Sequence, residues 1–290
     1  MKPPPFVYHV PMSLDEAYSV LAELGDEGRI LAGGQSLIPL MNFRLARPSH
    51  LVDINRIAEL DYIRREDGWL AIGATVRQAT LEHAQEVAGA CPLLVEAVRQ
   101  VGHPPIRHRG TVCGSVAHAD PAAELPAALV ALGADVVLSS RQGERRLPLA
   151  DFLIGPFTTA LEPGELVREV RTRSWEGPYA FVEYSHRQGD FAIAGAAAQL
   201  HVDDRGLIDR ASIVLCGVGA TPTRAEAAEQ RLQGTHGSPQ EIAAAAEAAV
   251  AGLEATSDIH GSAEYRRGVA RACVRRALEK ALGRVGGGVA

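Results

Sequence analysis

The segment over residues 31–37 has the residue types of an anion-binding loop. A short apolar stretch runs into the pair Gly33-Gly34, which is followed by polar Gln35 and Ser36 and then by an apolar, helix-like stretch. Backbone amides without a neighbouring Cβ can approach an anion closely, and the N-terminus of a helix adds a favourable potential. The sequence therefore predicts a phosphate cradle here, although paired glycines after a strand also form plain tight turns.

A second segment, residues 109–121, combines glycine and alanine with the hydroxyl side chains of Thr111 and Ser115. We expect the two loops to hold the two phosphates of a dinucleotide from opposite sides. Neither loop contains the Gly-Lys-Ser/Thr of a P-loop or the G-x-G-x-x-G of a nicotinamide-binding Rossmann unit. Nucleotide hydrolysis and nicotinamide binding therefore lack their motifs in this chain.

Three histidines, His103, His108 and His118, cluster around the second loop. No helix places two of them one turn apart, so polar loop histidines are favoured over metal ligands, with His118 a candidate for contact with a bound ligand. Cys113 lies in the same loop, where a small residue filling a crowded turn is favoured over a nucleophile. The sequence therefore predicts no metal site and no catalytic acid or base.

Two charged segments have both a structural and a functional interpretation. The turn at residues 187–190 (Arg-Gln-Gly-Asp) is favoured as a hairpin element whose arginine pairs with a carboxylate, with a functional turn as the alternative. The segment over residues 262–282 predicts an amphipathic helix with a basic side that is either solvated or docks a partner subunit. The basic residues on that side are Arg266, Arg267, Arg271, Arg275, Arg276 and Lys280.

Hydrophobic periodicity and turn residues predict an α+β chain. Helices are expected over residues 14–24, from about 36, and over 75–83, 92–101, 224–232, 239–253 and 262–282. Strands are expected over residues 30–32, 51–54, 69–74, 135–140, 145–149, 166–172, 180–186, 192–202 and 211–217. Ser13 and Glu16 suit a capping box. Residues 102–120 are expected to form a long loop, followed by a helix from Pro121 with Asp120 as its N-cap.

The composition is that of a soluble globular protein. The 290 residues include 29 basic and 35 acidic side chains, a net charge of −6, and 47% hydrophobic residues. This mild acidity, with 5% aromatic residues, disfavours a nucleic-acid-binding platform. Four scattered cysteines predict neither an iron–sulfur centre nor a disulfide scaffold. No segment has the length of a membrane span or the pattern of a signal peptide, which predicts a cytoplasmic protein.

Residues 175–178 (Trp-Glu-Gly-Pro) are the best candidate for a domain boundary. We expect a first domain over residues 1–175, with subdomains over about 1–55 and 56–175. A C-terminal domain of sheet plus helices is expected over residues 176–285. Residues 286–290, rich in glycine, are expected to form a flexible tail.

Blocks of residues along nearly the whole chain carry a resemblance to a known family. They are residues 32–39 (AGGQSLIP), 42–48 (NFRLARP), 51–54 (LVDI), 111–124 (TVCGSVAHADPAAE), 159–161 (TAL), 187–192 (RQGDFA) and 261–267 (GSAEYRR). With these blocks in this order, the sequence resembles the FAD-binding medium subunit of the molybdenum hydroxylases, a group that includes carbon monoxide dehydrogenase and xanthine dehydrogenase.

The resemblance implies a fold and a set of cofactor contacts. The fold is two α/β subdomains of the vanillyl-alcohol-oxidase/PCMH type around FAD, then a three-stranded antiparallel sheet with a helical bundle. The FAD pyrophosphate is expected between the two loops, and the flavin beside the segments around residues 102 and 161. The residues expected to bind FAD are Ala32, Gly33, Gly34, Gln35, Ser36, Leu37, Val101, Gly102, Ile106, Thr111, Gly114, Ser115, Ala117, His118, Asp120, Glu124 and Leu161.

The resemblance also implies partners. In this family a large subunit with a molybdenum–molybdopterin cofactor hydroxylates the substrate, and a small subunit with two [2Fe–2S] clusters carries the electrons. FAD in the medium subunit passes them to an external acceptor. The chain is thus expected to be an electron-transfer flavoprotein in a dimer of heterotrimers.

Three residues depart from the family pattern. Cys113 stands where many relatives have glycine, Gln35 where the carbon monoxide enzymes have histidine, and Glu183 where those enzymes tend to have lysine. The last two favour an N-heterocycle, aldehyde or purine-like substrate over carbon monoxide. The alternatives are the same role in a carbon monoxide dehydrogenase, a cofactor-free interaction subunit, and a stand-alone flavin oxidase.

Overall fold

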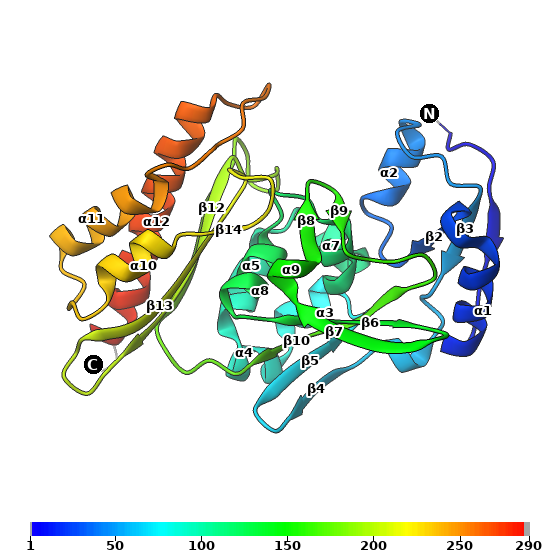
Figure 1. The fold of residues 1–290 in the computed structure, drawn as a ribbon, viewed down its shortest axis with the longest axis horizontal. Coiled ribbons are helices and arrows are strands. Elements are labelled where there is room, and N and C mark those ends of the chain that lie inside the picture. The colour runs from blue at the N-terminus through cyan, green and yellow to red at the C-terminus, as the bar shows by residue number, and fades with distance from the viewer. Residues whose placement is uncertain (1, 287–290) are drawn as a thin grey trace.

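The computed structural model describes residues 2–286, with the backbone alone for residues 284–286 (Figure 1). The chain forms sheets of three, five and four strands and one two-stranded ribbon. The three-stranded sheet lies at one end of an elongated molecule and the C-terminal helices at the other (Figure 1). Of the tail predicted over 286–290, Gly286 ends the last helix and the rest lies outside the described residues.

The first sheet is parallel, with strand order β1-β3-β2. Its strands are β1 Val7–His9, β2 Gly28–Leu31 and β3 His50–Asp53, and the helices between them are α1 Leu14–Leu24 and α2 Leu37–Asn42. At the start of α1 the Ser13 hydroxyl accepts from the Glu16 amide at 3.2 Å, while the Glu16 carboxylate accepts from the Met12 amide at 2.7 Å. The predicted strand–helix–strand rhythm is confirmed, and β1 is an additional strand.

The second sheet is antiparallel, with strand order β4-β5-β10-β6-β7. Its strands are β4 Ile63–Glu66, β5 Trp69–Gly73, β6 Asp135–Ser140, β7 Gly143–Pro148 and β10 Leu166–Arg173. The helices around it are α3 Gln78–His83, α4 Gln85–Ala90, α5 Pro92–Gln100, α6 Pro104–Arg109, α7 Val112–His118 and α8 Glu124–Ala131. Between β7 and β10 come α9 Leu149–Phe152 and the ribbon strands β8 Leu153–Gly155 and β9 Thr158–Thr159.

The loop predicted over residues 102–120 is wrong, because this segment contains the helices α6 and α7. Each helix has a local start signal: α6 begins with proline in its first turn, and Thr111 caps α7. The predicted N-cap role of Asp120 is also wrong. Its carboxylate accepts from the Ala122 amide at 2.9 Å within a turn, and α8 begins at Glu124.

The third sheet has strand order β11-β12-β13-β14 and is antiparallel. Its strands are β11 Tyr179–Tyr184, β12 Ala194–Val202, β13 Ile208–Cys216 and β14 Thr223–Arg224. The helices against it are α10 Glu226–Leu232, α11 Pro239–Val250 and α12 Ala263–Gly286. The three long strands agree with the expected three-stranded sheet, and β14 adds a two-residue fourth strand because the chain runs back beside β13 before α10.

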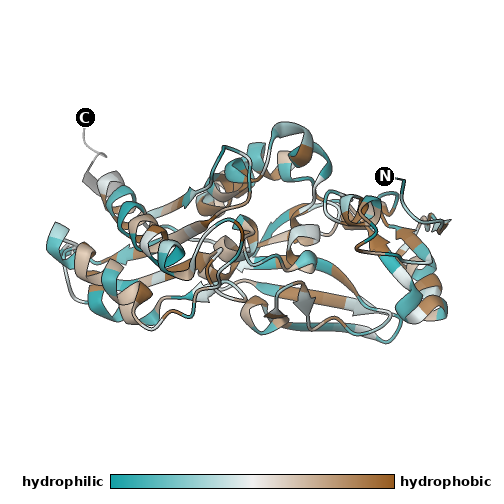
Figure 2. Ribbon diagram, turned by 90° about the horizontal axis from the view of Figure 1, so that it is seen from above, coloured by the Kyte–Doolittle hydropathy of each residue, from teal (hydrophilic) through white to brown (hydrophobic). Residues whose placement is uncertain are grey.

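Both faces of the third sheet are buried, which explains the alanine-rich sequence of β12. One face, with Phe181, Ala197 and Cys216, belongs to the core shared with α5 and α8. The other face, with Ala196 and Ala198, packs against the C-terminal helices. Figure 2 shows that hydrophobic residues gather on the strands and that the outer helices carry many hydrophilic ones. Within the described residues, no helix combines the length and the apolar character that crossing a membrane requires.

The basic side predicted for α12 is only partly correct. Arg271, Arg275 and Arg276 are exposed, but Arg266 is 5% exposed. Its guanidinium donates to the carbonyls of Ile193 and Gly217, both at 2.7 Å, and to the Asp258 carboxylate. Arg266 therefore joins α12 to the ends of β12 and β13 rather than facing solvent.

Candidate cofactor-binding site

Loop one (residues 31–37) lies directly against loop two (residues 109–121). A Cβ on Gly33 would lie 2.6 Å from the Arg109 carbonyl oxygen and 2.7 Å from the Gly110 Cα, so a side chain at this position would force the loops apart. Gly34 has a φ of +73°, a conformation that favours glycine. The predicted pairing of the two loops is therefore present, and the glycines allow it.

The backbone amides of Gly33 to Leu37 are the most unusual feature of loop one. Within residues 2–286 none of these amides donates a hydrogen bond to protein, whereas the next amide, of Ile38, donates to the Gly34 carbonyl at 3.1 Å. The Gln35 side chain folds back and donates to the Gly33 carbonyl at 3.2 Å. Ser36 makes no side-chain cap. Since partly buried amides without partners are costly, this run is suited to an anionic ligand.

Arg77 ties the two loops together. Its guanidinium donates to the Arg109 carbonyl at 2.5 Å and to the Asn55 side chain at 2.6 Å. The Asn55 amide group in turn donates to the Ala32 carbonyl at 2.8 Å and to the Asp53 carboxylate at 2.5 Å. Burial, and next the charge of Arg109, lowers the pKa of Arg77. Sequence reasoning missed this group, because its members come from separate segments with no shared motif.

Loop two is shaped by Thr111. Its hydroxyl accepts from the Gly114 amide at 3.0 Å, and a Cβ on Gly114 would lie 2.5 Å from that oxygen. Ser115 is half-buried, and its amide donates to the Thr111 carbonyl at 3.2 Å. Thr111 is thus a helix cap, and glycine at 114 is required for the cap to form.

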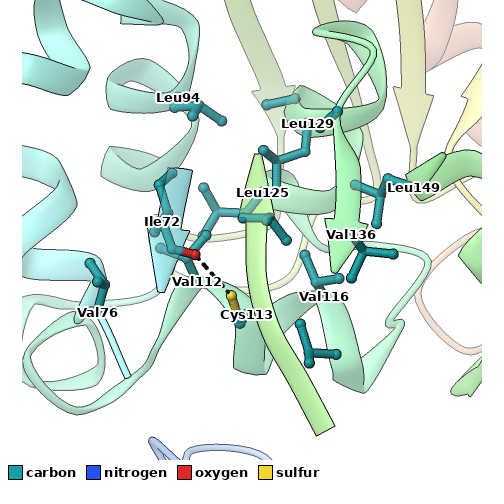
Figure 3. Close-up of a cluster of buried hydrophobic side chains, with 14 of the residues drawn as sticks. Ile72, Val76, Leu94, Val112, Cys113, Val116, Leu125, Leu129, Val136 and Leu149 are labelled. Carbon is teal, nitrogen blue, oxygen red and sulfur yellow. Dashed lines mark hydrogen bonds between the residues drawn. The ribbon is translucent and has the colours of Figure 1, made fainter. Parts of the chain in front are cut away.

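Cys113 is a core residue. Its thiol points into the hydrophobic cluster drawn in Figure 3, where it contacts the Ile72 carbonyl at 3.5 Å. Burial raises the pKa of this thiol well above its ordinary value. The interpretation of Cys113 as a small residue filling a crowded position is confirmed, and the geometry is not that of a nucleophile.

His118 lies at the end of α7, half-buried, with its ring 5.1 Å from the ring of Phe157. The ribbon that carries Phe157 is held there because the Phe157 amide donates to the Ala119 carbonyl at 2.9 Å. Burial lowers the pKa of His118, although the charge of Asp120 opposes the shift. His118 is therefore a neutral imidazole at pH 7.

The segment after α5 leads through α6 into loop two. Gly102 has a φ of +47°, and the carbonyls of Val101 and Gly102 accept from Arg107 at 3.1 and 3.2 Å. Gly189, in the turn between β11 and β12, approaches so closely that its Cβ would lie 2.6 Å from the His103 ring. The turn therefore packs on the first domain at this point.

The remaining predicted residues are spread around these elements. Ala117 and Leu161 are partly buried against the core, and Ile106 is exposed. The expected ion pair of Arg187 is wrong: within the described residues its exposed side chain meets no carboxylate. Arg187 therefore does not stabilise this turn by charge pairing.

Glu124 and Glu183 form a second unusual feature near loop two. Glu124, the first residue of α8, is 5% exposed, and burial raises its pKa to about 7. Burial, and next the charge of Glu124, raises the pKa of Glu183 to about 8. The Glu183 Oε2 atom is buried and has no hydrogen-bond partner among the described residues.

Two grooves lie elsewhere on the surface. One, of about 610 Å³, includes Tyr62, His83 and His108 in its lining, and the other, of about 640 Å³, includes Tyr184 and Tyr265. Neither lining includes a residue of loop one or loop two. In the part of the chain that the structure describes, no three His, Cys, Asp or Glu side chains gather as a metal site would require.

Comparison with known proteins assigns both halves of the chain. Residues 4–172 match the family described as the FAD binding domain in molybdopterin dehydrogenase, and residues 179–281 match the CO dehydrogenase flavoprotein C-terminal domain. The subunit alpha of the 6-hydroxypseudooxynicotine dehydrogenase complex of Paenarthrobacter nicotinovorans is 48% identical over 98% of this chain and 97% of its own.

Solved structures agree with this assignment. Quinoline 2-oxidoreductase from Pseudomonas putida 86 contains a chain with a TM-score of 0.94 and 40% identity, covering 98% of this chain and 99% of that one. Carbon monoxide dehydrogenase from Hydrogenophaga pseudoflava contains one with a TM-score of 0.94 and 39% identity, with the same coverage. This chain belongs to the FAD-binding medium subunits of the molybdenum hydroxylases, and it is a flavoprotein subunit of an oxidoreductase.

Proposed function

We propose that FAD lies across loops one and two with its pyrophosphate against the amides of Gly33 to Leu37. The observation that carries this assignment is the run of partly buried amides without protein partners, held against loop two by Gly33. Such amides donate hydrogen bonds to phosphate oxygens without needing a flexible cation. The residues present therefore fit the cofactor that the family binds.

The other residues of the site hold the two loops in place or are placed to contact the cofactor. Arg77 and Asn55 fix the spacing of the loops, and Thr111 fixes the start of α7. His118, neutral and beside Phe157, is suited to hydrogen bonding with a hydroxyl of the bound group, as are Ser115 and Asp120. FAD supplies the redox chemistry when bound, by accepting and releasing electrons; the protein supplies binding, orientation and exclusion of water.

In this proposal the chain works as one member of a larger assembly. Electrons arrive from two [2Fe–2S] clusters on a small partner subunit, after hydroxylation at a molybdenum–molybdopterin cofactor on a large partner subunit. They leave to an external acceptor, and two such heterotrimers form a dimer. The relatives named as subunits of dehydrogenase complexes support this arrangement.

For the assembly we propose an N-heterocyclic, aldehyde or purine-like substrate rather than carbon monoxide. Gln35 and Glu183 replace the residues expected in carbon monoxide enzymes. Relatives named for the oxidation of nicotine derivatives, caffeine and quinoline support the N-heterocyclic class in particular. Relatives named as carbon monoxide dehydrogenase chains, at 37% and 38% identity, make carbon monoxide the alternative.

Anaerobic titration of the purified complex tests the proposal. Stepwise addition of an N-heterocyclic substrate should bleach the flavin absorbance in parallel with that of the iron–sulfur clusters, and carbon monoxide should not. If substrate bleaches the clusters while the flavin stays oxidised, the electron-transfer role is wrong. If carbon monoxide alone bleaches both, the substrate class is wrong and the role stands.

A further inference from the structure

We infer that Glu124 and Glu183 form a carboxyl pair that holds a proton beside the FAD site and gives it up when the cofactor is reduced. This inference deepens the proposed function and rests on it for the position of the cofactor. It depends on three observations: the placement of the two side chains, their lack of compensating partners, and the neutral groups around them.

The placement follows from the sheet register and the link between the two domains. Glu183 on β11 is paired with Gly195 on β12, which is paired with Cys216 on β13, so the three positions lie in one row across the sheet. A Cβ on Gly195 would lie 2.7 Å from the Cys216 Sγ and 3.1 Å from the Glu183 Cβ. Glycine at 195 thus allows the Glu183 and Cys216 side chains to pack on the same face of the sheet on either side of it.

Glu124 approaches this row from the first domain. The Gly217 amide, at the end of β13, donates to the Pro121 carbonyl at 2.8 Å. That bond holds the turn before α8 against the end of the sheet, and the same turn continues loop two. The two carboxyls are therefore close enough for the charge of Glu124 to act on Glu183, and they lie where loop two meets the C-terminal domain.

Neither carboxyl is compensated by a cation. Among the described residues, neither takes part in an ion pair, and Glu124 accepts a hydrogen bond from its own backbone amide. Two buried carboxylates without a cation cannot both ionise cheaply. At pH 7 the pair therefore retains a proton in the folded chain.

The groups that face the pair leave this proton in place. On the same face of the sheet lies the Cys216 thiol, whose pKa burial raises well above its ordinary value; on the other face lies the Cys273 thiol of α12, whose pKa burial raises to about 12. Both thiols are neutral at pH 7. Asp120 adds a negative charge that raises the pKa of Glu124 further, while Arg276 on α12 acts on Cys273.

On α5, Glu96 is already paired with a cation. The Glu96 carboxylate accepts from the Phe181 amide at 2.9 Å and pairs with Lys280 at 3.3 Å. Lys280 is therefore already paired with Glu96 and does not neutralise Glu183. The pair has its own proton and no fixed counter-ion on the elements packed around it.

The carboxyl pair would supply the proton that reduction of the cofactor requires. When bound, FAD would accept two electrons from the iron–sulfur clusters of a partner subunit, together with one proton for a new N–H bond. An O–H bond of the carboxyl pair breaks to supply that proton, directly or through water, and leaves one more carboxylate negative charge. When the external acceptor took the two electrons, the carboxyl pair would bind that proton again and lose the added negative charge.

The first test is an infrared pH titration of the purified chain. Wild-type protein should show a protonated-carboxyl band that persists above pH 6 and disappears around the pKa values of about 7 and 8. Glu183→Gln should abolish the high-pH component and lower the titration point of the remaining carboxyl. Glu254→Gln, at an exposed position, serves as the matched control and should leave the band unchanged. A band that is absent above pH 6, or unchanged in Glu183→Gln and Glu124→Gln, overturns the inference.

The second test measures the pH dependence of the flavin midpoint potential in the intact complex. For wild type and Glu254→Gln, the plot of midpoint potential against pH should change slope near the titration point of the pair. For Glu183→Gln, that change of slope should disappear or move to another pH. An identical profile in all three means that the pair does not supply the proton. If the clusters never reduce the flavin, the proposed function fails by itself, while the infrared titration still decides whether the pair holds a proton.

Discussion

The Arg266 region and loop one both bury hydrogen-bond donors. The donors of Arg266 are nearly all paired with protein acceptors, whereas those of loop one are not. Arg266 is nearly inaccessible and donates to two carbonyls and to the Asp258 carboxylate, all at 2.7 Å. The amides of Gly33 to Leu37 have no protein acceptor within the described residues. Arg266 stabilises the fold because nearly all of its hydrogen bonds are made to protein acceptors. The loop-one amides have no protein acceptor, so they are available to bind a ligand.

The same contrast separates two acidic groups. Asp258 is paired with Arg266, and hydrogen bonding to that guanidinium lowers its pKa to about 2. Glu183 has a buried, unpartnered oxygen, and burial raises its pKa to about 8. The shifts have opposite signs because one carboxylate gains a cation and the other loses solvent.

Removing Arg266 should have the largest effect on stability. Arg266→Met leaves the carbonyls of Ile193 and Gly217 without their donor. Hydrogen bonds to a charged group contribute about 1.5–3 kcal/mol each, so we expect the free energy of unfolding to fall by roughly 3–5 kcal/mol. Arg271→Met, which removes an exposed pair with Glu247, should cost less than about 1 kcal/mol. Urea unfolding of both variants measures the difference. Equal losses of stability would contradict the view that the buried, hydrogen-bonded Arg266 stabilises the fold more than the exposed Arg271.

Gly33→Ala should weaken cofactor binding more than it weakens the fold. The new Cβ pushes against the Arg109 carbonyl, and overpacking of this kind costs roughly 1–3 kcal/mol, which is about a tenfold to hundredfold loss of FAD affinity. Gly89→Ala, on helix α4 with no atom within 4 Å, is the control and should bind FAD normally. Flavin fluorescence during reconstitution of the apoprotein measures both affinities. Normal binding by Gly33→Ala would show that the loops need not touch.

Arg77→Met should have a smaller effect on the same binding. It removes the donors that hold loop two to Asn55, and the loss of such a bond is worth about 1.5 kcal/mol, or roughly tenfold in affinity. Arg99→Met, which removes a more exposed arginine 3.8 Å from Glu82, is the control. Isothermal titration with FAD compares them, and an Arg77→Met affinity equal to that of the control contradicts the role of Arg77.

For a change of one pH unit, the pH dependence of stability should show the smallest effect. The pKa of Glu183 is raised from 4.5 to about 8 in the folded chain, so its contribution to stability is complete below pH 4.5 and is lost as the pH rises through 8. We expect the wild-type melting temperature to fall by roughly 2–4 °C for each pH unit within this range, because one unit of pKa shift corresponds to about 1.4 kcal/mol. Glu183→Gln should show a flatter profile, and a slope identical to wild type would contradict the assignment.

Local signals predicted much of loop one and loop two. Gly33, Gly34 and Thr111 belong to contiguous segments, and their roles depend on backbone freedom and capping, which sequence shows directly. The helix α7 was harder to predict, because Gly110 precedes it and Gly114 lies within its first turn, and both resemble loop residues. The Thr111 hydroxyl satisfies the Gly114 amide there, and that contact appears once the chain is folded.

Contacts between distant segments could not be predicted in this way. Arg77 meets Asn55 across 22 positions, and Arg266 meets Ile193 across 73, with no motif linking either pair. Glu183 did carry a signal, because residues two apart on a strand share a face and Phe181 is buried. Alternation along the strand therefore predicts that the Glu183 carboxyl lies on the same buried face as Phe181.

Hydrogen–deuterium exchange of the chain with and without FAD tests the central claim most directly. If the amides of Gly33 to Leu37 hold the pyrophosphate, peptides covering these residues should exchange much more slowly when FAD is bound. Peptides from α11, on the opposite side of the third sheet from loop two, should not change. Tight FAD binding with unchanged exchange over residues 33–37 would contradict the account.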